Sequence, residues 1–180
     1  GSSGNSTSIG YHEADQVLTT FQYFKQQGEE KIILFGTSMG SAAILKALYD
    51  QQDKNTLNPA GIVLECPFGS LYKTVCARFS LMNIPTVPMA ALLTFWGGVQ
   101  HGYWAFSHNP AMYAEAVHCP ALLIYGEQDD RVSMEETKTI FSTMKGKKIL
   151  RTYPDAGHQV FTEATELRWI QDVNQFVSTL

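Results

Sequence analysis

Residues 31–40 read KIILFGTSMG, and this stretch decides the fold. Lys31 to Phe35 form a short apolar, β-branched run of the kind that makes a strand. Residues 36–40 match the pattern G-x-S-x-G, in which small residues let the chain turn sharply from a strand into a helix. Apolar residues then recur at helical spacing: Ala42, Ala43, Leu45, Leu48 and Tyr49. The stretch therefore predicts a strand, a sharp turn and a helix.

Further strands follow this turn along the chain. Apolar runs of strand length occur at Ile62 to Leu64, Ala121 to Tyr125 and Ile149 to Tyr153. Strands that read as unbroken apolar runs and alternate with helices are typical of a parallel sheet with helices on both faces. The sequence therefore predicts the α/β class, with residues 1–180 forming one domain.

Helices are predicted between and around these strands. The first runs from Tyr11 to Gln27 and ends where Gly28 stops the apolar pattern. Ser133 and Glu136 form a capping box that begins another helix. The last helix is predicted to pack through one apolar face, made of Leu167, Ile170, Val173, Phe176 and Leu180.

Residues 67–120 break the alternation, because the segment is too long for a single crossover helix. It is rich in aromatic side chains: Phe68, Phe79, Phe95, Trp96, Tyr103, Trp104 and Phe106. We interpret it as a helical insertion, or lid, in which Asn109 and Pro110 begin a helix. Its aromatic side chains fit an apolar acyl pocket and simple core packing equally well.

Composition and charge exclude several classes of protein. The chain has 180 residues, 44% of them hydrophobic and 17% charged, which suits a globular domain with a sizeable core. The net charge is −4 and basic residues are scattered, so no nucleic-acid partner is expected. No apolar run is long enough to span a bilayer.

The cysteines point neither to a disulfide framework nor to a metal site. Cys66, Cys76 and Cys119 are an odd number at unrelated spacings. We expect them to be buried free thiols, and we expect neither a metal nor another cofactor. No signal peptide begins the sequence, but because we expect the true N-terminus to be missing, the cellular compartment stays open.

Ser38, at the centre of the G-x-S-x-G turn, is the candidate nucleophile. A buried turn serine is the alternative, but the preceding strand and following helix supply the context that the motif requires. A serine hydroxyl is a weak nucleophile unless a base removes its proton as it attacks. A histidine and a carboxylate are therefore expected further along the chain.

Asp129 and His158 are the candidates for these two roles. Asp129 follows the third strand, where the carboxyl edge of the sheet presents a loop residue to the site. Asp130 and Glu65 are alternative acids, and a solvated acidic turn is the non-functional reading of the Asp129 loop. His158 follows the last strand, and structural or surface positions are expected for the other histidines: His12, His101, His108 and His118.

With its serine, acid and histidine in this order, the chain resembles the C-terminal part of an α/β-hydrolase. The resemblance is to the serine aminopeptidase-like and related esterase branches, and it covers about Tyr11 to Leu180. Residues 64–68, which read LECPF, are similar to the strand-to-lid junction of those enzymes. Cys119-Pro120, just before the strand that carries the acid, belongs to the same resemblance.

The resemblance also implies a role for each candidate residue. Ser38 would attack the carbonyl of a small acyl substrate and form an acyl-enzyme, while His158 moves the proton. Asp129 would orient the imidazole and stabilise its charged form. The backbone N–H of Met39 would be one oxyanion donor.

The chain departs from the family pattern in having fewer predicted strands. Gly1 to Gly10 resembles the Gly- and Ser-rich loop after the fourth family strand, so we expect the sequence to be N-terminally truncated and to lack the second oxyanion donor. Such a loss costs on the order of 100- to 1,000-fold in turnover, so the segment alone is expected to be nearly inactive. The strand Lys31 to Phe35 should be covered on both faces, with one bare edge that favours self-association.

The predicted function is that of a serine hydrolase acting on a carboxylic ester, with thioesters and amides as variants of one mechanism. A non-catalytic ligand-binding member of the fold is one alternative. Transfer of the acyl group to an alcohol or amine is another, because it uses the same three residues. The combination of Ser38, Asp129 and His158 favours an enzyme over a binding protein.

Overall fold

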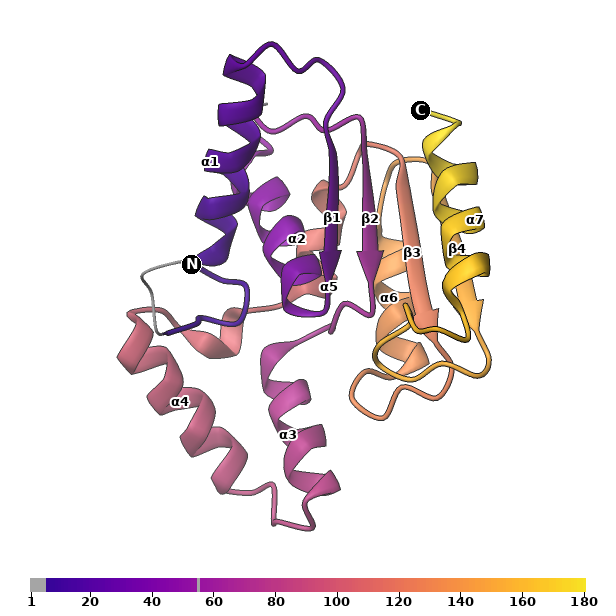
Figure 1. The fold of residues 1–180 in the computed structure, drawn as a ribbon. Coiled ribbons are helices and arrows are strands. Elements are labelled where there is room, and N and C mark those ends of the chain that lie inside the picture. Colours follow the sequence, from indigo (N-terminus) through magenta and orange to yellow (C-terminus); the bar gives the residue numbers. More distant parts are fainter. Residues whose placement is uncertain (1–5, 55) are drawn as a thin grey trace.

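The computed structural model describes residues 6–54 and 56–180. One four-stranded sheet has the order β1-β2-β3-β4, with every neighbouring pair parallel (Figure 1). The strands are β1 (Ile33–Thr37), β2 (Gly61–Glu65), β3 (Ala121–Gly126) and β4 (Lys148–Tyr153). The predicted α/β class and parallel sheet are confirmed.

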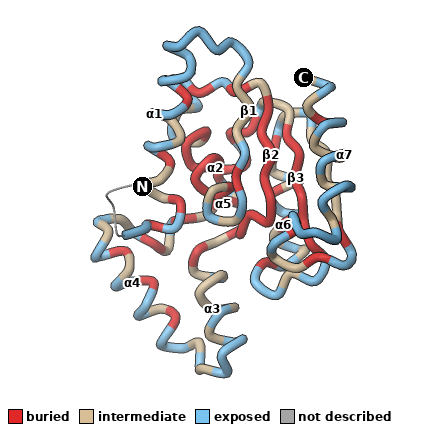
Figure 2. Tube along the Cα trace, viewed as in Figure 1, coloured by how far each residue is buried: buried red, intermediate tan, exposed pale blue. Residues whose placement is uncertain are grey.

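Helices cover both faces of the sheet. On one face lie α1 (Glu13–Gln26), α2 (Met39–Gln51), α5 (Pro110–Tyr113) and α6 (Met134–Thr143), which pack on alternate strand residues such as Ile62 and Leu123. On the other face α7 (Glu166–Val177) packs on the residues between them, such as Val63 and Leu122. Because both faces are covered, β2 and β3 are buried throughout, as their unbroken apolar sequences require (Figure 2).

The strand β1 lies at the edge of the sheet and pairs only with β2 in the described chain. It begins two residues later than predicted and extends to Thr37. The expectation that both of its faces are covered is wrong for Phe35, which is 54% exposed. On this side Phe35 meets the ring of Trp169 on α7 edge-to-face, with 5.8 Å between the ring centroids, and this contact leaves much of the side chain exposed.

Residues 67–120 divide into two parts. The helices α3 (Leu71–Leu81) and α4 (Met89–His101) form a hairpin that extends away from the carboxyl ends of the strands (Figure 1). After the short 3-10 turn at Ala105–Ser107, α5 returns to the body of the protein, where Tyr113 and the following residues join the main core. Asn109 begins α5 as predicted, with its Oδ1 accepting a 3.2 Å hydrogen bond from the N–H of Met112.

The ends of α6 and α7 test two further sequence predictions. The capping box of Ser133 and Glu136 at the start of α6 is present. The predicted packing face of α7 is wrong in part, since Leu167 and Ile170 are exposed. Trp169 takes the packing position instead, in register with Val173 and Phe176, because its indole N–H reaches a buried carboxylate at the end of β2. Throughout the described ranges, none of the helices has the length and apolar character needed to cross a membrane.

Candidate active site

The structure brings the side chains of Ser38, His158 and Asp129 into one hydrogen-bonded row. The Nε2 atom of His158 lies 2.9 Å from Ser38 Oγ, and its Nδ1 lies 2.8 Å from Asp129 Oδ2. Ser38 follows β1, Asp129 follows β3 and His158 follows β4. Because the carboxyl ends of parallel strands share one edge of the sheet, residues 120 and 29 positions apart in sequence meet there.

The turn at Ser38 is held by packing and hydrogen bonds. Ser38 has a φ of +50°, a region that residues other than glycine rarely adopt. Its N–H donates a 2.8 Å hydrogen bond to the carbonyl of Glu65 on the neighbouring strand. Gly36 has no room for a side chain, because a Cβ there would lie 2.5 Å from the carbonyl carbon of Gly40, whereas a Cβ at Gly40 would meet nothing within 4 Å.

The side chain of Asp129 is buried, and both of its oxygens are hydrogen-bonded. Its Oδ1 accepts hydrogen bonds from the backbone N–H groups of Arg131 (2.8 Å) and Val132 (3.0 Å), while Oδ2 faces His158. Burial raises the pKa of the carboxyl, but the hydrogen bonds from His158, Arg131 and Val132 outweigh it, so the pKa is lowered. An ionised Asp129 can only accept, so Nδ1 of His158 carries the proton and Nε2 is free to accept one from Ser38.

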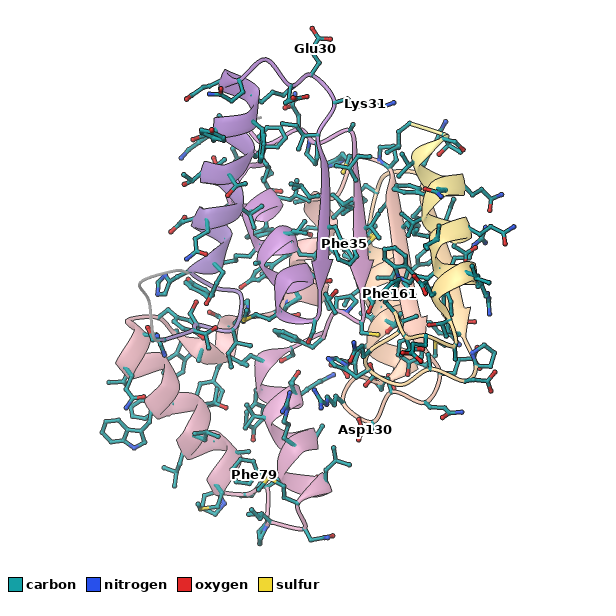
Figure 3. The ribbon with its side chains drawn as sticks, in the orientation of Figure 1. Glu30, Lys31, Phe35, Phe79, Asp130 and Phe161 are labelled. Atoms are coloured by element: carbon teal, nitrogen blue, oxygen red, sulfur yellow. The ribbon has the colours of Figure 1, made fainter. Side chains whose placement is uncertain are left out.

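The two alternative acids occupy different environments. Asp130 is exposed, and its carboxylate lies 3.9 Å from the guanidinium of Arg131 (Figure 3). Glu65 is buried, but its oxygens accept hydrogen bonds from the backbone N–H of Val160 (3.2 Å) and the indole N–H of Trp169 (3.0 Å). In the residues that the structure covers, neither carboxylate hydrogen-bonds to His158.

The remaining histidines lie apart from this row. His108 is buried among aromatic rings, and its Nε2 lies 3.0 Å from the carbonyl of Ile9. Burial lowers the pKa of His108 to about 4, so it is neutral at pH 7 and structural. His12 bonds to the carbonyl of His101, and His118 is exposed.

Cys66 is a site residue that sequence reasoning missed. It follows β2, has a φ of +45° and is completely buried. Its Sγ lies within 4.8 Å of a carboxylate oxygen of Asp129 and of a ring nitrogen of His158. Its position after the strand next to β1 was the available signal. Cys76 and Cys119, contrary to expectation, are only partly buried, and all three cysteines are free.

Cys66, Asp129 and His158 are near enough together to hold a metal ion. Burial raises the pKa of the Cys66 thiol, and the charge of Asp129 raises it further. The thiolate, not the thiol, is the metal ligand, and the other two side chains are already hydrogen-bonded to each other. The chemistry of this donor set therefore disfavours a metal.

Two cavities flank the row of side chains. One, of about 410 Å³, is mostly apolar and is lined by Ile9, Ser38, Met39, Phe68, Leu71, Thr74, Val75, Arg78, Phe79 and Leu93. The other, of about 550 Å³, lies on the side of Phe35 and Phe161, between β1 and α7 (Figure 3). Thus α3 and α4 supply most of the apolar wall beside Ser38, in the size range of small-molecule sites.

The arrangement is suited to nucleophilic chemistry at a carbonyl group. Met39 is the first residue of α2, and N–H groups in the first turn of a helix have no partner within it. Such a group beside Ser38 is placed to receive negative charge. The role of Met39 as an oxyanion donor stays a prediction.

The chain is similar to known proteins in both sequence and structure. The model of the prolyl oligopeptidase family matches residues 4–180. Among solved structures, an esterase of Pyrococcus furiosus has a TM-score of 0.72 and 19% identity, covering 98% of this chain and 65% of its own. A monoacylglycerol lipase of Paleococcus ferrophilus has a TM-score of 0.62 and 20% identity, covering 94% of this chain and 77% of its own.

A dipeptidyl peptidase 4 of Porphyromonas gingivalis is also similar, with a TM-score of 0.67 and 15% identity, covering 94% of this chain and 23% of its own. None of the curated proteins matches the sequence. The chain spans a little less than two thirds of the length of the Pyrococcus esterase. At these identities the likeness shows a shared fold.

Proposed function

The chain belongs to the prolyl oligopeptidase family, and from this premise we propose that it is a serine hydrolase that cleaves a carboxylic ester through an acyl-enzyme on Ser38. The observation that carries the proposal is the row of hydrogen bonds from Asp129 through His158 to Ser38, beside a mostly apolar cavity. A non-catalytic binding protein has no chemical need for this row. Acyl transfer to an alcohol or amine would use the same residues.

In the proposed reaction the Ser38 hydroxyl attacks the ester carbonyl and its proton passes to Nε2 of His158. Asp129, which is ionised, stabilises the imidazolium that forms. The negative carbonyl oxygen accepts a hydrogen bond from the N–H of Met39. His158 then protonates the departing alcohol, and the acyl group stays on Ser38.

Water completes the cycle. His158 takes a proton from the water molecule as it attacks the acyl-enzyme, and returns that proton to Ser38 as the carboxylic acid leaves. No residue is consumed in the two half-reactions.

The cavity lining favours an ester with an apolar group as the substrate. Its walls are mostly aliphatic and aromatic, and among the described residues that line it Arg78 is the one cationic side chain and none is Asp or Glu. An apolar acyl chain fits such walls, whereas the ammonium group of a peptide would find no carboxylate there. A peptide bond is the second candidate, because the family model that matches is that of a peptidase.

The proposal also assigns an architecture to the chain. We take residues 1–180 as one domain in which the segment 67–120 is inserted between β2 and β3. Its α3–α4 hairpin would act as a lid over Ser38, since both helices contribute side chains to the cavity wall.

Covalent labelling with a fluorophosphonate probe tests the proposal. In the full-length protein, wild type should be labelled and Ser38→Ala should not, while Ser142→Ala, which removes an exposed hydroxyl on α6, should label like wild type. Undiminished labelling of Ser38→Ala would assign the nucleophile elsewhere. A matched series of acetyl to decanoyl nitrophenyl esters and peptide nitroanilides then separates the ester from the peptide substrate.

A further inference from the structure

Helix α4 and the last turn of α3 lie within a segment that has no Asp, Glu, Lys or Arg. This segment lies between Arg78 and Glu115. More than half of the large apolar side chains that are exposed in the described chain lie between residues 81 and 104. Soluble surfaces are normally interspersed with charges, so this surface differs from the rest of the molecule.

Helix α4 buries small side chains and exposes large apolar ones, which is the reverse of a helix that packs on the core of a soluble protein. Its buried residues are small and recur every fourth position: Ala90, Thr94 and Gly98. A Cβ at Gly98 would lie 2.5 Å from the carbonyl oxygen of Tyr103, so the close approach requires a small residue. Core-facing helices normally bury their large apolar side chains instead.

The large side chains of this helix face outward. We define the α4 apolar face as the exposed residues of the helix together with one on either side of it: Val87, Met89, Leu92, Leu93, Phe95, Trp96, Val99 and Trp104. Figure 2 shows the buried positions returning along α4 with exposed segments between them. Helices that contact lipid typically pack their small residues against protein and direct their large apolar residues outward.

We propose that the α4 apolar face docks on the surface of a zwitterionic lipid bilayer. An interface with a protein partner tolerates charged residues at its rim, whereas the hydrocarbon of a bilayer disfavours each charged residue. A bilayer therefore explains why the segment has no charged residue. Trp96 and Trp104 are the residue type that settles at the boundary of lipid and water. The helix has only 13 residues, so it lies in the membrane surface.

The docking face is continuous with the cavity beside Ser38. Leu93 is exposed on the face and also lines that cavity. An ester held in the bilayer would therefore reach Ser38 along apolar walls, a consequence that rests on the proposed function. The net charge of −4 predicts that binding does not depend on anionic lipid.

Flotation of the purified protein with phosphatidylcholine vesicles tests the docking. The double variant Leu92→Glu/Trp96→Glu changes two residues of the face that do not line the cavity. Burial of each side chain contributes about tenfold or more in affinity, so the variant should bind about 100-fold more weakly than wild type. The matched control, Leu167→Glu, alters an 85% exposed residue on α7 and should bind within about twofold of wild type.

Three measurements keep docking separate from catalysis and from misfolding. Circular dichroism should be unchanged in both variants, and hydrolysis of a short water-soluble ester should match wild type. Ser38→Ala should float normally, because docking does not use the hydroxyl. Loss of ester hydrolysis with normal flotation would therefore count against the proposed function alone.

The proposal is overturned if wild-type protein fails to float, or if the double variant floats as well as wild type. It is equally overturned if sedimentation shows a dimer that the double variant abolishes while vesicles bind neither protein. That result would assign the face to a second copy of the chain.

Discussion

The indole N–H of Trp169 donates a 3.0 Å hydrogen bond to Oε2 of Glu65, which joins the last helix to the end of β2. The other carboxylate oxygen of Glu65 accepts from the N–H of Val160, two residues after His158. The backbone carbonyl of Glu65 accepts from the N–H of Ser38. One buried residue therefore holds the segments that carry both the candidate nucleophile and the candidate base.

Trp169→Phe should lower the free energy of unfolding by about 1–3 kcal/mol, because Oε2 of the buried Glu65 loses its donor. Urea denaturation followed by circular dichroism measures the change. Leu167→Ala, on the exposed side of the same helix, should stay within about 0.5 kcal/mol of wild type. Equal effects of the two substitutions would remove the positional role that we assign to Glu65.

Asp129→Asn should reduce kcat for ester hydrolysis by about 1,000- to 10,000-fold, because an amide no longer selects the histidine tautomer that accepts the proton of Ser38. Asp130→Asn should leave kcat within about twofold, since Asp130 is exposed. Steady-state kinetics on a soluble ester compare the two. A large loss in Asp130→Asn with normal turnover in Asp129→Asn would reverse our choice of acid.

Gly36→Ala and Gly40→Ala should differ sharply although both lie in the same five-residue motif. A Cβ at residue 36 would clash with the backbone of Gly40 and Ser41 at 2.5–2.6 Å, so we expect a loss of several kcal/mol or insoluble protein. Residue 40 has open space and lies in α2, where alanine is favoured over glycine by about 0.5–1 kcal/mol. Thermal unfolding of the two variants decides the point, and a stable Gly36→Ala protein would contradict the packing at this turn.

Lowering the pH from 6.5 toward 4 should destabilise the protein through His108. Burial lowers the pKa of His108 to about 4 in the fold, whereas an unfolded histidine titrates near 6.5. Between pH 6.5 and 4 the unfolded chain binds more protons than the folded chain. The free energy of unfolding therefore decreases as the pH is lowered, by roughly 1–3 kcal/mol in total.

Urea midpoints measured at several pH values give the slope that tests this expectation. The slope should be smaller in His108→Gln and unchanged in His118→Gln, which alters an exposed histidine. An identical slope in wild type and His108→Gln would show that other groups cause the pH dependence.

Much of the fold could be predicted because local patterns and tertiary packing agree in it. The apolar runs of β2 and β3 are buried on both faces, so their sequences identified them directly. The capping box of Ser133 and Glu136 and the cap at Asn109 are local interactions that need no tertiary information. Ser38, Asp129 and His158 each follow a strand of the parallel sheet, β1, β3 and β4, so the sequence placed all three at its carboxyl edge.

The features that the sequence did not predict depend on contacts between residues far apart in the chain. The packing face of α7 was predicted from apolar spacing, but a hydrogen bond from Trp169 to Glu65 directs Trp169 toward the sheet and leaves Leu167 exposed. The approach of Cys66 to Asp129 joins residues on different strands, so no local pattern reports it. In the same way, only the fold shows which residues of α4 face outward.

The left-handed backbone at Ser38 has a consequence for how this protein could be made more robust. A residue with a Cβ costs on the order of 1–3 kcal/mol in such a conformation, and glycine avoids that cost. Ser38→Gly should therefore melt at a higher temperature than wild type while losing the hydroxyl on which the proposed chemistry depends. Selection for thermal stability alone would remove this serine, so in a mutational library that retains activity the stabilising substitutions should accumulate away from the turn.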